Sequence, residues 1–225
     1  MKICVPIRQK TLVETEKQIK KSQKHADFIE IWLDSFGEKV SLSDLKNLIK
    51  SSKKPIIAVC RASNEKGGFW GSEMERLGVL QKAVLCGAKL VDCGIQTDKK
   101  LIKILWQTCK KSGAQLIISK HIWNKTPPLS ELLKIVQKGE KLSADIVKIA
   151  THISQWKDTV TLFELTSRLL QKKKNVIVIG MGEKGKISRI GCALLGGFLT
   201  YVALDEKSKT APGQLTLREL KNFTF

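Results

Sequence analysis

Two patterns of hydrophobic and polar positions alternate along this chain. Short apolar runs rich in β-branched residues recur, and amphipathic stretches with helical spacing lie between them. This alternation is typical of βα units that build a parallel sheet. We expect eight strands, at residues 2–7, 28–33, 55–60, 90–95, 115–121, 144–150, 175–181 and 199–204. The expected helices occupy residues 12–25, 42–51, 72–86, 98–112, 129–140, 158–173, 187–195 and 216–222.

Eight strand and helix pairs in 225 residues favour an α/β fold, a (β/α)8 TIM barrel with a single domain over residues 1–225. The alternative is an open doubly wound sheet. Its dinucleotide-binding form is disfavoured because no G-x-G-x-x-G sequence follows the first expected strand. No linker rich in proline, glycine or serine divides the chain.

The net charge of +19 suggests nucleic acid as a first candidate partner. The lysines, however, are spread over most expected helices without interleaved aromatic residues, so we interpret them as solvated faces and expect no specific nucleic-acid site. Their field would still attract small anions. No apolar run approaches the roughly 20 residues that span a membrane. Arg8 and Lys10 interrupt the first apolar run before a signal peptide could form, so we expect a cytoplasmic protein.

The six cysteines contain no C-x-x-C pair and have no histidine at metal-ligand spacing. Most lie in apolar runs, which is typical of reduced, buried thiols. We therefore expect no structural metal site and no disulfide framework, and a reducing compartment.

Lys148 is the most unusual residue of the chain. It lies inside the apolar run 144–150, where its ammonium group would be removed from water. Desolvation disfavours the charged form of lysine, and a free amine can attack a carbonyl to form a Schiff base. The run alone leaves an alternative open, in which the lysine points to a barrel rim or pairs with a carboxylate.

Other chemically distinctive residues fall where a barrel has its active site, at the carboxyl ends of the strands. They are Glu30, Arg61, His121, Met181, Arg189 and Gln214. A histidine such as His121 is more often structural when taken alone. Next to an imine-forming lysine it can instead move protons to and from the carbon beside the imine.

In these residues and their neighbours, the chain resembles type I 3-dehydroquinate dehydratase over essentially its full length. The order and strand placement of the matching motifs make the resemblance specific. The motifs are IEIWLD at 29–34, Cys60-Arg61, Glu65, Gly67-Gly68, SKH at 119–121, Thr126-Pro127, VKIA at 147–150, Met181-Gly182, Gly185, Ser188-Arg189, Thr200-Tyr201 and TAPGQ at 210–214.

The resemblance implies a hydro-lyase of the shikimate pathway that converts 3-dehydroquinate to 3-dehydroshikimate and water without a cofactor. It implies that Lys148 forms the Schiff base and that His121 acts as general acid and base, with Glu65 orienting His121. The implied substrate-binding residues are Glu30, Trp32, Arg61, Met181, Arg189, Thr210 and Gln214. A homodimer is expected from the resemblance as well.

The chain departs from the family pattern at a few positions. Trp32 stands where the family usually has an arginine that contacts substrate, and an indole cannot pair with an oxyanion as a guanidinium does. Cys93-Gly94 occupies a place where the family commonly has an acidic residue after its Asp, and Thr210 replaces the usual serine but keeps its hydroxyl. We expect an active enzyme with weaker substrate binding.

Two other classes of protein remain in view. Another Schiff-base barrel, such as an aldolase, would use Lys148 but would leave Arg189 and the 210–214 segment unexplained. A basic, non-catalytic binding protein would show salt-dependent affinity for nucleic acid and no turnover.

Overall fold

The computed structural model describes residues 1–37 and 40–223. By their internal contacts the residues form two compact units. The amino-terminal unit is Val5–Ile117, and the carboxyl-terminal unit is Met1–Cys4 together with Ile118–Phe225. The division falls within the strands β1 (Ile3–Ile7) and β5 (Gln115–Ile122). A single domain over residues 1–225 therefore stays a prediction.

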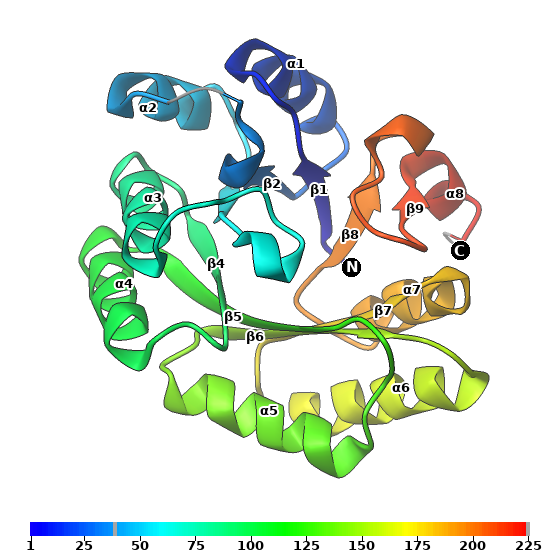
Figure 1. Cartoon of the computed structure of the whole chain (residues 1–225). Coiled ribbons are helices and arrows are strands. Elements are labelled where there is room, and N and C mark those ends of the chain that lie inside the picture. The colour runs from blue at the N-terminus through cyan, green and yellow to red at the C-terminus, as the bar shows by residue number, and fades with distance from the viewer. Residues whose placement is uncertain (38–39, 224–225) are drawn as a thin grey trace. The chain divides into compact units, whose positions relative to one another are not determined.

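The amino-terminal unit alternates strands and helices along the chain (Figure 1). Its elements after β1 are α1 (Leu12–Ser22), β2 (Phe28–Trp32), the 3-10 turn η1 (Leu33–Ser35), α2 (Leu42–Lys50), β3 (Ile56–Val59), the 3-10 turn η2 (Ser63–Glu65), α3 (Glu73–Leu85), β4 (Leu90–Gly94) and α4 (Lys99–Ser112). Strands β2, β3 and β4 are parallel neighbours. Their register places Trp32 opposite Val59 and Val59 opposite Asp92, so the carboxyl ends of the strands lie at one edge.

Side-chain caps explain where these helices begin. Thr11, Ser41 and Ser72 each accept a hydrogen bond from a backbone N–H in the first turn of α1, α2 and α3. Asp98 does the same at α4. Such caps satisfy donors that have no partner inside the helix and stabilise its start by about 1 kcal/mol. The helices therefore start close to the expected positions.

The carboxyl-terminal unit continues the alternation. Its elements after β5 are α5 (Leu129–Lys141), β6 (Ile146–His152), α6 (Trp156–Gln171), β7 (Val176–Met181), the 3-10 turn η3 (Glu183–Gly185), α7 (Lys186–Leu194), β8 (Thr200–Ala203), the 3-10 turn η4 (Glu206–Ser208), β9 (Leu215–Thr216) and α8 (Leu217–Lys221). Strand β6 pairs in parallel with β7, and β8 pairs in parallel with both β1 and β9. Figure 1 shows α5 and α6 side by side along one face of β6 and β7.

A core cluster fixes the orientation of β6. Val147 and Ile149 are buried in it together with Leu132 of α5 and Leu162 of α6. Because successive strand residues point to opposite faces, Lys148 points to the face away from these helices.

The expected strands and helices are confirmed, with corrections at their ends. Residue 33 belongs to η1 and not to a strand, and residues 144–145 precede β6, which instead continues to His152. The extension occurs because the register of β6 on β7 runs on to the pair His152 and Met181. The 3-10 turns and the two-residue strand β9 have no periodic signal long enough to recognise, so the sequence did not predict them.

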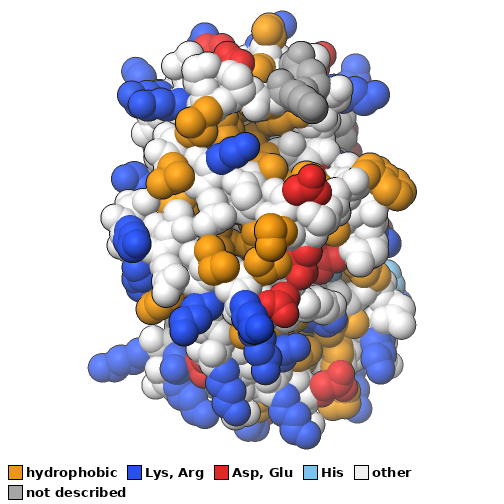
Figure 2. All heavy atoms as spheres, turned by 60° about the vertical axis from the view of Figure 1, so that its left-hand side comes forward, with side chains coloured by type: hydrophobic (Ala, Val, Ile, Leu, Met, Phe, Trp, Pro, Cys, Tyr) orange, Lys and Arg blue, Asp and Glu red, His pale blue; other side chains and the backbone are white. Residues whose placement is uncertain are grey.

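All six cysteines lie within the described residues and are buried, and none of them forms a disulfide bond. In the part of the chain that the structure describes, no helix is both long and apolar enough to cross a bilayer. Lysine and arginine side chains are scattered over the face drawn in Figure 2, with apolar side chains between them and few acidic ones.

Candidate active site

Lys148 lies in β6 and is buried, with only 5 % of the residue exposed. Its Nζ donates a hydrogen bond of 2.9 Å to Tyr201 Oη and lies 4.2 Å from the centre of the Tyr201 ring. Tyr201 comes from β8 and is buried as well. The Lys148 amine is therefore held in a buried position against the Tyr201 ring and does not lie at an exposed rim.

His121 lies near the end of β5 and is partly buried. Its ring stacks on Trp123, with the ring centres 5.4 Å apart and the planes 20° from parallel. The loop that follows is tied to β6, because Thr126 Oγ1 lies 2.8 Å from Thr151 Oγ1 and donates to the carbonyl of His152 at 2.8 Å. A stack and an anchored loop together restrict the orientations that the imidazole can adopt.

Arg189, on α7, is a buried guanidinium with an unused donor. The residue is 2 % exposed, and Nη2 donates to the carbonyl of Pro212 at 3.1 Å. Its Nε is buried and has no hydrogen-bond partner within residues 1–37 and 40–223. Burial lowers the pKa of the guanidinium to about 10. A buried cation with a donor to spare fits a carboxylate ligand, which a guanidinium can bind through two parallel hydrogen bonds.

The loop after β8 folds back on Gly182. Gly182 N donates to the carbonyl of Pro212 at 3.2 Å. Gly213 has a φ of +68°, and a Cβ there would lie 2.0 Å from the Gly182 carbonyl oxygen. Only glycine fits this position. Within the loop, Thr210 N and Oγ1 donate to Gln214 Oε1 at 2.8 and 3.2 Å, so the Gln214 amide oxygen is occupied and its NH2 group is the end available to a ligand.

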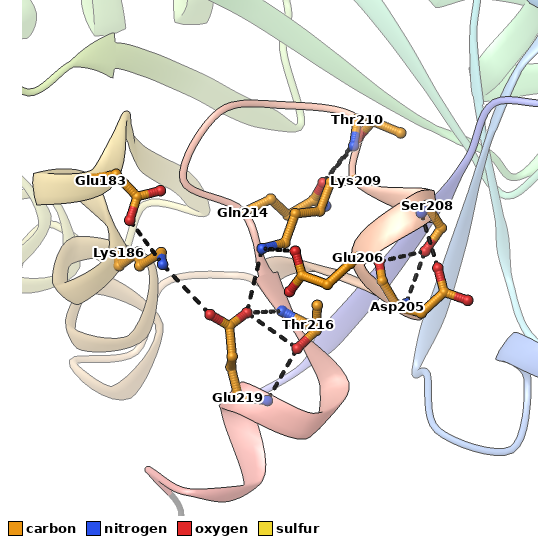
Figure 3. Close-up of polar contacts among 10 residues, drawn as sticks. All are labelled: Glu183, Lys186, Asp205, Glu206, Ser208, Lys209, Thr210, Gln214, Thr216 and Glu219. Carbon is orange, nitrogen blue, oxygen red and sulfur yellow. Dashed lines mark hydrogen bonds and ion pairs between the residues drawn. The ribbon is translucent and has the colours of Figure 1, made fainter.

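Ion pairs with Glu219 of α8 tie this loop, through Lys209, and α7, through Lys186, to the same carboxylate (Figure 3). Glu219 accepts from Thr216 N at 2.8 Å at the start of α8, and Lys186 of α7 and Lys209 reach it at 3.4 and 3.5 Å. The Thr216 backbone hydrogen bond is the main reason why the pKa of Glu219 falls from 4.5 to about 2, and the two lysines lower it further. Hydrogen bonding to Glu183 is the main reason why the pKa of Lys186 is raised.

Met181 is the last residue of β7 and is 3 % exposed. It lies opposite His152 in the register of β6 and β7. The carboxyl-terminal unit thus places a thioether, a second histidine and the Lys148 strand next to one another.

The amino-terminal unit contributes a second set of polar residues at the carboxyl ends of β2, β3 and β4. Trp32 Nε1 donates to Glu30 Oε1 at 2.9 Å, and Glu30 is buried. Arg61 Nη2 donates to both carboxylate oxygens of Asp92 at 3.2 Å, and both residues are buried. The guanidinium of Arg61 also lies 5.7 Å from the centre of the Trp32 indole.

The loop after β3 is pinned by carboxylates. Asp34 accepts from the backbone N–H groups of Arg61 and Gly68 at 2.9 and 2.8 Å. Glu65 of η2 lies against Gly94, where a Cβ would come within 2.7 Å of Glu65 Oε1. The glycine at position 94 therefore makes room for the Glu65 carboxylate. The proposed contact of Glu65 with His121 joins residues of the two units and stays a prediction.

Each unit thus holds its own share of the expected residues. The carboxyl-terminal unit contains His121, Lys148, Met181, Arg189, Thr210 and Gln214. The amino-terminal unit contains Glu30, Trp32, Arg61 and Glu65. No role was predicted from the sequence for Tyr201, Trp123 or Asp92. Asp92 carried a usable signal, since an acid inside the apolar strand 90–94 is as anomalous as Lys148. The stack of Trp123 on His121 depends on side-chain geometry and had no such signal.

The sequence profile described as Type I 3-dehydroquinase matches residues 3–225. The chain belongs to this family. Relatives named as 3-dehydroquinate dehydratases are similar in sequence to this chain over nearly its whole length. The 3-dehydroquinate dehydratase of Methanocaldococcus jannaschii is 36% identical over 223 residues, which cover 97% of this chain and 96% of that protein. The chloroplastic bifunctional 3-dehydroquinate dehydratase/shikimate dehydrogenase of Arabidopsis thaliana is 37% identical over 225 residues. That match covers 97% of this chain and only 36% of the longer plant protein.

A solved structure of the same family gives the fold. The type I 3-dehydroquinate dehydratase of Clostridium difficile, solved with covalently modified comenic acid, is 27% identical and superposes with a TM-score of 0.88. The match covers 98% of this chain and 89% of that one. The predicted fold class, an α/β barrel of the TIM type, is confirmed by this likeness, and the open doubly wound sheet is wrong.

Proposed function

We propose that the chain is a 3-dehydroquinate dehydratase of the shikimate pathway, which removes water from 3-dehydroquinate to give 3-dehydroshikimate. The observation that carries the proposal is the buried amine of Lys148, held on Tyr201 in a chain of the type I 3-dehydroquinase family. A ketone is the group that such an amine attacks.

In the proposed reaction the Lys148 amine adds to the substrate ketone and the resulting carbinolamine loses water, so that a C=N bond replaces the C=O bond. The iminium draws electrons from the adjacent carbon, and His121 removes a proton from that carbon to leave an enamine. His121 then returns the proton to the departing hydroxyl, which leaves as water on the same face. Hydrolysis of the conjugated imine releases the product and restores the amine.

The polar side chains described above suit this substrate. Arg189 pairs with the substrate carboxylate, since its guanidinium is buried and its Nε has no partner among the described residues. Gln214 and Thr210 add hydrogen bonds from the loop after β8. Glu30 and Arg61 hold ring hydroxyls, Met181 packs beside the imine, and Glu65 orients His121. The proposed chemistry uses only the chain's own side chains.

The test is to incubate the protein with 3-dehydroquinate and follow the ultraviolet absorbance of the conjugated enone. Borohydride is added in parallel to reduce the imine, and the adduct is located by peptide mass spectrometry. We expect the enone to appear and the adduct to be on Lys148. No enone, or an adduct on a different lysine, overturns the assignment.

The same experiment separates the other classes of protein. An aldolase would give a borohydride adduct on Lys148 with its own ketone substrate but no enone from 3-dehydroquinate. A basic binding protein would give neither, and would instead show salt-dependent affinity for nucleic acid.

A homodimer and a cytoplasmic location stay predictions. Size-exclusion chromatography with light scattering measures the mass of the assembly in solution. A mass equal to that of one chain would reject the homodimer.

A further inference from the structure

Arg8 is an exposed arginine that stacks on the one aromatic residue at the end of β2. It directly follows β1, and its guanidinium carbon lies 4.8 Å from the centre of the Trp32 indole. Arg61, which is buried, lies 5.7 Å from the same ring. Trp32 therefore stands within reach of two guanidinium groups. In the described part of the chain, Arg61 pairs with Asp92, whereas Arg8 forms no ion pair.

The indole is a fixed platform for Arg8. Its N–H donates a hydrogen bond to Glu30 Oε1 at 2.9 Å, and this bond fixes the orientation of the ring relative to β2. An aromatic face attracts a guanidinium without neutralising it and leaves all of its N–H donors directed outward in the plane. Arg8 is thereby kept near Glu30 and Arg61 as an oriented cation whose donors remain available. A carboxylate partner would have consumed them.

We propose that Arg8 is a substrate-binding residue of this chain and that Trp32 positions it. The inference rests on the proposed function. Arg8 donates to a hydroxyl of the same polyhydroxylated, anionic ring that Glu30 and Arg61 hold. Because the guanidinium of Arg8 lies over the side chain at position 32, an arginine at position 32 would place its own cation in nearly the same region. The two positions are thus alternative sources of one cation.

The simplest competing explanation is that Arg8 only covers an otherwise exposed indole. Arg8→Met keeps an unbranched chain over the ring and removes the donors. Lys10→Met is the matched control, since Lys10 is exposed two residues further along and its loss removes the same single charge from the positive field. Steady-state kinetics on 3-dehydroquinate are measured at about 150 mM salt, where remote charges are screened. Thermal unfolding shows that each variant is folded.

We expect Arg8→Met to raise KM about tenfold or more while kcat changes by less than about threefold, as the loss of a charged hydrogen bond requires. Lys10→Met is expected to leave both constants within about twofold. Equal constants for Arg8→Met and the unaltered protein, or the same rise in KM for both variants, overturns the inference.

Adding Trp32→Arg gives a second, independent readout. In the Arg8→Met protein it is expected to lower KM again, because the cation returns. In the unaltered protein it brings a third guanidinium beside Arg8 and Arg61 and is expected to raise KM or leave it unchanged. A rise in KM in both backgrounds overturns the inference. Absence of any turnover by the unaltered protein overturns the proposed function, and with it this assignment, whereas an active enzyme that is indifferent to Arg8→Met overturns this assignment alone.

Discussion

The side-chain nitrogen of Lys148 lies 2.9 Å from the phenolic oxygen of Tyr201 and 4.2 Å from the centre of the Tyr201 ring. The contact joins β6 to β8 and gives the amine a fixed direction. Tyr201→Phe removes the hydrogen bond and keeps the ring. We expect imine formation to slow about tenfold, which corresponds to one hydrogen bond of about 1–1.5 kcal/mol, while the borohydride adduct stays on Lys148. Lys148→Ala should give no adduct. An unchanged rate in Tyr201→Phe would show that packing alone positions the amine.

His121 is expected to act after the imine has formed. His121→Gln should still give the borohydride adduct, while turnover falls by about 10²–10⁴-fold through loss of general acid–base catalysis. His152→Gln is the matched control, because His152 is also partly buried at the end of a strand in the same unit. If His152→Gln shows the large loss and His121→Gln does not, the roles of the two histidines are exchanged.

Arg189 is expected to bind the substrate carboxylate through a geometry that lysine cannot reproduce. Arg189→Lys should raise KM about tenfold or more, because a single ammonium replaces a pair of parallel hydrogen bonds. Arg218→Lys provides the control, since Arg218 is exposed on α8 and should show no kinetic effect. A KM that is unaffected by Arg189→Lys would remove the carboxylate from this position.

Glu219 should make the stability of the carboxyl-terminal unit depend on pH. Its pKa is about 2, against 4.5 for the ordinary group. Because the folded pKa is the lower one, the stabilisation is complete above pH 4.5 and is lost as the pH falls toward 2. The side chain is 33% exposed, so solvent screening limits the contribution to about 1 kcal/mol.

Glu219→Gln tests this directly by thermal unfolding at several pH values. We expect the variant to melt roughly 2–4 °C below the unaltered protein near neutral pH. The difference should shrink below pH 4.5. A gap that stays constant down to pH 2.5 would mean that the carboxylate charge contributes nothing.

Gly213 and Gly78 should respond to alanine in opposite directions. Gly213→Ala forces a Cβ against the Gly182 carbonyl at a φ of +68°. We expect the free energy of unfolding to fall by several kcal/mol, or the loop to be displaced and KM to rise. At Gly78, inside α3, a Cβ meets nothing within 4 Å, and alanine should stabilise by about 0.5–1 kcal/mol. Equal effects at both positions would contradict the close packing of the loop on Gly182.

The strands and helices could be predicted because burial leaves a period in the sequence. Val147 and Ile149 face the helices and Lys148 faces away, which is the alternation of a strand. The short 3-10 turns and β9 span only three and two residues each, which is too few for a period to show. They became visible only in three dimensions.

The candidate site divides in the same way. Lys148 and Asp92 are charges within apolar runs, so each is anomalous in the sequence itself. Tyr201, Trp123 and Arg8 are ordinary in their local sequences, and their significance comes from partners 53, 2 and 24 positions away in the chain. No local pattern specifies which aromatic ring a cation will meet.

The contact between Arg189 and the Pro212 carbonyl gives the loop after β8 a share in recognition. If one guanidinium serves both the loop and the substrate carboxylate, then a bound carboxylate and an ordered loop support each other. An inhibitor without an acidic group would therefore lose more affinity than the ion pair with Arg189 contributes. It would also leave the segment 210–214 less ordered. The affinity of a ligand should therefore depend on how well it orders the loop as much as on its own contacts with the other side chains.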